Sequence, residues 1–124
     1  MRPRTFLGRI IGGFSIVSLL LSPAWATPLN EDGLHQQDWF LQQSFLELAD
    51  DWQEANAEGR GLAIIWELAG CPSCARMHKD YLSQAAIRDL ITQHFHVLQL
   101  NYTGLRRVTD FDGQEMTERE LAKR

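Results

Sequence analysis

Two cysteines, Cys71 and Cys74, are the residues of this sequence best suited to carry out chemistry. They are the only cysteines among 124 residues and stand three positions apart in Gly70-Cys71-Pro72-Ser73-Cys74. A structural disulfide stabilises most when it closes a long loop, and a bridge over two intervening residues closes almost none. The spacing therefore favours reversible thiol–disulfide chemistry, with Cys71 as the nucleophile and Cys74 as the resolving thiol.

The elements expected to hold the two sulfurs follow a strand–helix–helix–strand order. The first strand is a continuous apolar run, as expected for a strand buried on both faces. Pro72 suits the first turn of the following helix, and Ser83 suits the N-cap of the next one. The predicted elements are strand 62–68, helix 72–82, helix 84–94 and strand 97–101. They form a βαβ unit with parallel strands, which places Cys71 at a helix N-terminus, where backbone N–H groups favour a thiolate.

Three further elements are predicted outside this unit. A helical pattern covers about residues 36–57, and its apolar stripe consists of Leu41, Phe45, Leu48, Trp52 and Ala55. The stretch 108–116 contains the turn Asp112-Gly113 and predicts a small hairpin. Thr117 and Glu120 have the spacing of a capping box, which indicates a helix that begins there.

Several other residues could assist the cysteines or bind a metal. Glu67, near the end of the first strand, could accept a proton from the resolving thiol. An equally simple interpretation is that its carboxylate extends into water and has no role in the chemistry. His78 could stabilise a thiolate or aid proton transfer, although a partly exposed helix histidine is the simpler interpretation. Cys71, Cys74 and His78, joined by His94 or His96, could instead form a soft metal site. Covalent haem attachment needs a His directly after the second cysteine, and Ala75 in that position argues against it.

The N-terminus has the pattern of a secretory signal peptide. A basic start is followed by an apolar run, and Ala24-Trp25-Ala26 is a small-x-small cleavage site. We therefore expect residues 1–26 to be a cleaved signal, 27–34 a linker and 35–124 the functional domain. Residues 27–124 carry nine basic and sixteen acidic side chains, a formal charge of −7. This charge argues against nucleic acid and against membrane surfaces as partners.

The run from the leading strand through Gly-Cys-Pro-Ser-Cys to Met77-His78 resembles exported thioredoxin-like proteins, and most of all the SoxW-type thioredoxin-related proteins. The stretches 39–51, 82–101 and 108–113 resemble the same group. This resemblance implies a thioredoxin fold and exchange of disulfides with partner proteins, among them carriers of sulfur intermediates.

The sequence departs from the thioredoxin pattern in two places. Ile65 stands six positions before Cys71, where thioredoxins have a buried Asp, so Glu67 is the remaining candidate for proton handling. No proline follows Pro72, so the cis-proline loop and the final strands of that fold are not found. We therefore expect an α/β, thioredoxin-like fold that is incomplete at its C-terminus.

Together these features predict an exported, periplasmic thiol–disulfide oxidoreductase, with reduction as the favoured direction. The expected site residues are Cys71 and Cys74, with Glu67, Pro72 and His78 as auxiliary candidates. The expected partners are protein thiols or disulfides and an upstream thiol reductant, and no cofactor is expected. The alternatives are a copper- or zinc-handling module that uses Cys71, Cys74 and His78, and an inactive truncated fragment.

Overall fold

Two parallel strands lie at the centre of this computed structural model, which describes residues 27–124. The predicted signal peptide, residues 1–26, lies outside the described residues. β1 (Gly61–Glu67) pairs with β2 (Phe95–Asn101), from Gly61 opposite Phe95 to Glu67 opposite Asn101. The parallel register confirms the predicted βαβ unit, and it brings the carboxyl ends of both strands to the same edge of the sheet.

The crossover between the two strands consists of three consecutive helical segments. These are α2 (Pro72–Met77), the π-helical η1 (His78–Leu82) and α3 (Ala85–His94). Residues 72–82 are therefore helical throughout, as predicted, and the winding changes from α to π at His78. The predicted N-cap at Ser83 is wrong. Gln84 holds that position, because the Ser83 hydroxyl donates to the Lys79 carbonyl at 2.5 Å.

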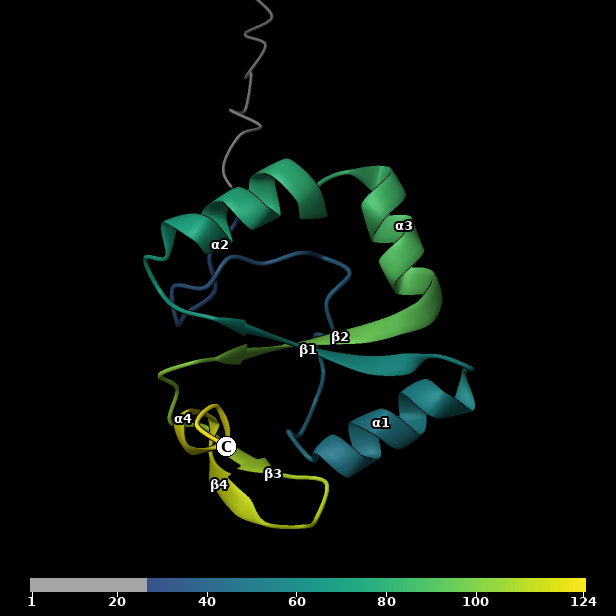
Figure 1. Cartoon of the computed structure of the whole chain (residues 1–124), viewed down its shortest axis with the longest axis vertical. Coiled ribbons are helices and arrows are strands. Elements are labelled where there is room, and N and C mark those ends of the chain that lie inside the picture. The colour runs from purple at the N-terminus through teal and green to yellow at the C-terminus, as the bar shows by residue number, and fades with distance from the viewer. Residues whose placement is uncertain (1–26) are drawn as a thin grey trace, which may run out of the picture.

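Each face of the sheet carries its own apolar cluster, because alternate residues of β1 point to opposite sides. Figure 1 shows the sheet nearly edge-on, with α2 and α3 on one side and α1, β3 and β4 on the other. Leu62, Ile64 and Trp66 pack against a cluster made of Leu46, Leu48, Leu98, Leu100 and Val108. Ala63 and Ile65 pack against a cluster made of Phe40, Leu82 and Val97. Contacts on both faces explain the unbroken apolar run of β1.

The N-terminal helix is shorter than its periodicity predicts. α1 covers Leu48–Ala57, whereas residues 36–47 are not helical. Tertiary contacts override the pattern: the Leu41 N–H donates to the Val97 carbonyl at 2.8 Å, and Leu46 has a φ of 61° that ends any helix there. Leu48 and Ala55 of the predicted stripe are buried, but Phe45 is 98% exposed.

The C-terminal elements follow the sequence prediction. β3 (Arg107–Thr109) and β4 (Glu115–Thr117) form an antiparallel hairpin, and α4 (Glu118–Leu121) begins with a complete capping box between Thr117 and Glu120. In the hairpin loop, Asp110 accepts a hydrogen bond from the Gln114 N–H at 2.8 Å. This bond is the largest of the effects that lower the pKa of Asp110 below its ordinary value.

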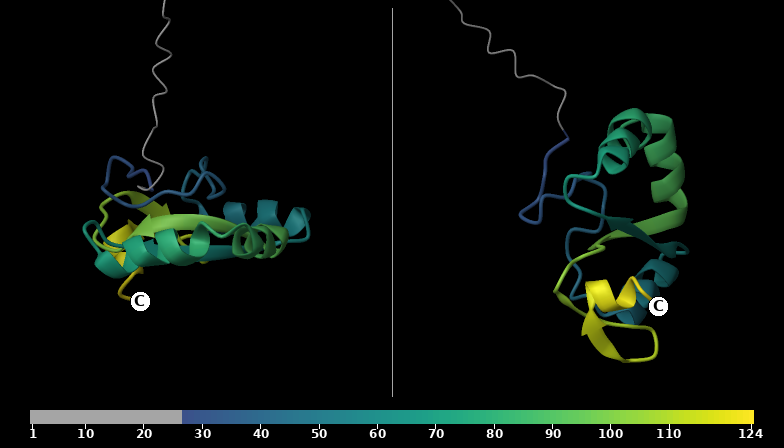
Figure 2. Two further views of the ribbon diagram at one scale, coloured as in Figure 1. Left: turned by 90° about the horizontal axis from the view of Figure 1, so that it is seen from above. Right: turned by 60° about the vertical axis from the view of Figure 1, so that its left-hand side comes forward.

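The segment that precedes α1 packs against the sheet. Residues 27–34, predicted as a linker, form a turn in which the Asn30 side chain accepts from the Asp32 and Leu34 N–H groups, and Leu34 is 1% exposed. Figure 2 shows the segment between this turn and α1 following one side of the sheet. Among the helices of residues 27–124, none has the length and apolar character needed to cross a membrane.

Candidate redox site

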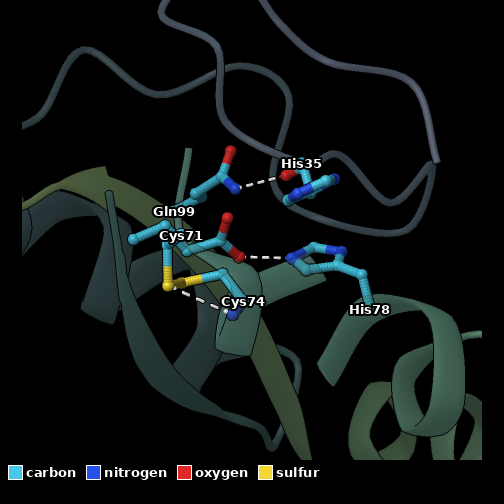
Figure 3. Close-up of a disulfide and its surroundings, with 6 residues drawn as sticks. His35, Cys71, Cys74, His78 and Gln99 are labelled. Atoms are coloured by element: carbon cyan, nitrogen blue, oxygen red, sulfur yellow. Dashed lines mark hydrogen bonds and ion pairs between the residues drawn. A yellow bond between two sulfur atoms is a disulfide. The ribbon is translucent and has the colours of Figure 1, made fainter. Parts of the chain in front are cut away.

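The candidate redox site lies where β1 ends and α2 begins. Gly70 turns the chain there with a φ of 71°, a left-handed conformation that favours glycine. Pro72 follows in the first turn of α2, where a missing N–H leaves no helix bond unmade. Cys71 and Cys74 are joined by a disulfide, with their Cα atoms 5.3 Å apart (Figure 3). The strand, turn and helix around the motif are therefore arranged as predicted.

Cys71 is the N-cap residue of α2, so its sulfur faces the unpaired N–H groups of the first helical turn. Sγ of Cys71 accepts a hydrogen bond from the Cys74 N–H at 3.1 Å. A charged acceptor at this position gains from the bond and from the helix dipole. Both cysteines are half-buried, so a partner can reach them. The arrangement can stabilise a thiolate on Cys71 and keeps Cys74 within bonding distance of it.

A buried acid–histidine pair adjoins the motif. Nε2 of His78 is bonded to Oε1 of Glu67, and neither side chain has any exposed surface. Nδ1 of His78 lies 3.0 Å from the amide nitrogen of Gln37. The interpretation of Glu67 and His78 as water-facing residues is therefore wrong. The crossover brings the start of η1 back over the end of β1, and each side chain there gives the other its polar partner.

Comparison of the sequence with protein families places this site in a known group. The sequence model of the thioredoxin-like domain matches residues 48–124, which include the whole βαβ unit and the motif. The chain belongs to the thioredoxin-like family. No curated protein and no solved structure matches it significantly.

Membership of the thioredoxin-like family confirms the predicted fold class. The family together with the Cys71–Cys74 disulfide fits a thiol–disulfide oxidoreductase whose partners carry thiols or disulfides. In this thioredoxin-like domain the register places Ile65 opposite Gln99, whose side chain donates to the His35 carbonyl at 2.5 Å. At this level of β1 the side chain of Gln99 ties the N-terminal segment to the sheet.

The histidines proposed for a metal site are not brought together in the thioredoxin-like domain. Both ring nitrogens of His78 have partners, Glu67 and Gln37. His96 pairs with Leu62 near the amino ends of the strands, away from Glu67, and bonds to Glu58 at 3.1 Å. Within residues 27–124, no group of three or more His, Cys, Asp or Glu side chains is arranged to hold a metal ion. The donor set does not fit the metal-handling alternative.

Three site residues have no signal in the sequence: Gln37, Gln99 and His35. Gln37 contacts His78 across 41 positions, and Gln99 contacts His35 across 64. The ring centroids of His35 and His78 lie 5.4 Å apart. Such contacts depend on how the segment before α1 crosses the sheet, and no local pattern reports that path.

Proposed function

We propose that the chain is an exported thiol–disulfide oxidoreductase that reduces disulfides of partner proteins in the periplasm. The main support for this proposal is the position of Cys71, whose sulfur caps α2 and accepts a hydrogen bond from the Cys74 N–H at 3.1 Å. In the reduced form the Cys71 thiolate attacks a partner disulfide and one partner sulfur leaves as thiolate. Cys74 then attacks Cys71, restores the disulfide seen here and releases the second partner sulfur.

The amount of thiolate stabilisation favours the reducing direction. Strong oxidants of this chemistry owe their high potential to a reduced form that is unusually stable. In the part of the chain that the structure describes, Sγ of Cys71 accepts one backbone hydrogen bond. A single hydrogen bond from a backbone N–H to a charged sulfur contributes about 1.5–3 kcal/mol. We therefore place the potential with the reductases.

The export and partner assignments rest on the sequence. The basic, apolar and small-residue order of residues 1–26 supports secretion, and the resemblance of the motif region supports a SoxW-type protein whose partners carry sulfur intermediates. Export predicts that protein recovered from the periplasm begins at Thr27. Recovery of an intact N-terminus in the cytoplasm would contradict it.

Insulin reduction and redox equilibration test the proposed activity. The reduced protein should accelerate the dithiothreitol-driven reduction of insulin, and equilibration with glutathione should give a potential of about −230 to −270 mV. A potential near about −120 mV, the range of strong oxidants, would contradict the reducing direction. A folded protein that leaves the rate of insulin reduction unchanged would contradict the activity itself.

A further inference from the structure

The outer edge of β1 carries backbone groups that point away from the rest of the sheet. The Glu67 carbonyl accepts a hydrogen bond from the Tyr102 N–H at 2.8 Å, so the backbone of Glu67 faces β2. Backbone groups of successive residues in a strand point to alternate edges, so those of Leu62, Ile64 and Trp66 face outward. In the part of the chain that the structure describes, no loop or turn backbone bonds to these three residues. β1 therefore presents a row of unpaired N–H and C=O groups.

The outer edge of β2, in contrast, is covered. The Val97 carbonyl accepts a hydrogen bond from the Leu41 N–H at 2.8 Å, and the Asn101 N–H donates to Oε1 of Glu118 at 2.9 Å. The N-terminal segment, which follows one side of the sheet in Figure 2, and α4 thus occupy this edge. The free edge of the sheet is that of β1.

The β1 edge lacks the features that usually keep edge strands from pairing. Such strands are blunted by charged side chains, proline or a bulge. Gly61–Trp66 contains no charged residue and no proline, and its pairing with β2 runs without a bulge. Each of these residues stays partly exposed although β1 has apolar clusters on both faces. An apolar hollow of about 230 Å³ lies along the strand, lined by Ala63, Ile65, Leu82 and Ile91 among others.

We propose that two copies of this chain associate through their β1 strands, which pair antiparallel about a two-fold axis at Ile64. With Ile64 opposite Ile64 of the second copy, Leu62 of each copy lies opposite Trp66 of the other. Residues that face each other in this way exchange both backbone hydrogen bonds. This register therefore gives a partner to every outward N–H and C=O group of the three residues. The product is a four-stranded sheet in the order β2–β1–β1–β2.

The side chains of β1 suit a second copy of the same strand. Residues opposite each other in an antiparallel pair lie on the same face. Ala63 would meet Ile65 of the other copy, a small side chain against a large one, beside the apolar hollow. Leu62 would meet Trp66, an aliphatic side chain against an aromatic one. A symmetric pair brings like charges together wherever the edge is charged, and a strand without charged residues from Gly61 to Trp66 avoids this cost.

The size of the edge indicates a reversible dimer. A strand of this length, with its side chains on both faces, covers roughly 400–500 Å² in each copy. That is little more than half of the about 800 Å² that each partner buries in a standard interface. We expect a Kd on the order of 10 µM. Residues 27–124 carry nine basic and sixteen acidic side chains, so association should tighten as salt screens the repulsion between the copies.

Sedimentation equilibrium of the full chain, over concentrations that bracket this Kd, tests the interface. Ile64→Pro removes an outward N–H and leaves the hydrogen bonds to β2 in place, because proline is tolerated where an edge N–H faces solvent. It should raise the Kd at least about tenfold. Phe45→Ser is the matched control, since the Phe45 side chain is apolar, 98% exposed and outside β1. It should leave the Kd unchanged.

Cysteine cross-linking tests the register without the proline variant. In a chain with Cys71→Ser and Cys74→Ser, Ile64→Cys would place two Cα atoms about 5.5 Å apart across the two-fold axis. This distance suits a disulfide. Leu62→Cys is the control, because the two copies of Leu62 would lie about 13 Å apart along the strands. Mild oxidation should therefore produce covalent dimers with Ile64→Cys and few with Leu62→Cys.

Each contrary result would overturn the proposed dimer. A wild type that stays monomeric across the concentration range would do so. A dimer that persists in a folded Ile64→Pro variant would show pairing through another surface, as would loss of the dimer in Phe45→Ser. Equal cross-linking of Ile64→Cys and Leu62→Cys would contradict the register. None of these measurements uses the redox activity, so their outcome is independent of the proposed function.

Discussion

Cys74→Ser is expected to convert the protein into a trap for its partners. Cys71 can still attack a partner disulfide, but the hydroxyl group that replaces the resolving thiol cannot displace the partner from the mixed disulfide. Turnover in the insulin assay should fall to the uncatalysed rate. Non-reducing gels should show covalent complexes with partner proteins, and dithiothreitol should separate them by reducing the intermolecular disulfide.

Cys71→Ser is the matched control for this trap. It leaves Cys74 as the only thiol, away from the N-cap position that favours a thiolate. It should lose turnover and form few complexes at neutral pH. If Cys71→Ser trapped partners and Cys74→Ser did not, the assignment of nucleophile and resolving thiol would be reversed.

Gly104→Ala is expected to cause a large loss of stability. A Cβ at Gly104 would overlap the Glu118 carboxyl oxygen Oε2 and lie 2.7 Å from Glu118 Cδ and 2.9 Å from Asn101 Cβ. Glu118 is fully buried, and its other oxygen Oε1 accepts from the Asn101 N–H at 2.9 Å and from Arg106 at 2.6 Å. The added methyl group must displace this network, so urea denaturation should show a loss of about 2–3 kcal/mol.

A double-mutant cycle separates this overlap from other effects of the substitution. In a Glu118→Ala background the carboxyl group is gone, so the added Cβ loses its two shortest contacts and keeps the one with Asn101 Cβ at 2.9 Å. Gly104→Ala should then cost about 1 kcal/mol or less, because residues in contact do not contribute additively. An equal loss in both backgrounds would show that the Glu118 carboxyl group does not limit the space at Gly104.

The elements near the motif were predictable because local rules determine them. The apolar run of β1, Pro72 at the start of α2 and the capping box at Thr117 each depend on neighbours within a few residues. Residues 36–47 follow a helical periodicity but are held by the Leu41–Val97 hydrogen bond and by the left-handed Leu46. A tertiary contact decided their conformation, and periodicity does not report such contacts.

The candidate site also has a part that the local sequence predicts and a part that it does not. Cys71 and Cys74 follow from spacing alone, and Glu67 and His78 were named as auxiliary candidates. Their mutual contact and their burial were not predicted, because they depend on how the crossover packs over the end of β1. Gln37 had no signal, since its contact with His78 joins segments that lie 41 positions apart.

The central claim is that the start of α2 makes the Cys71 sulfur easy to ionise, and alkylation tests it most directly. In the Cys74→Ser variant the rate of reaction of Cys71 with iodoacetamide is measured against pH, in the folded protein and in urea. The account predicts that the unfolded chain reacts with a midpoint near that of an ordinary thiol, about 8.5. The midpoint of the folded protein should lie at least about one pH unit lower. Coinciding folded and unfolded profiles would contradict the account.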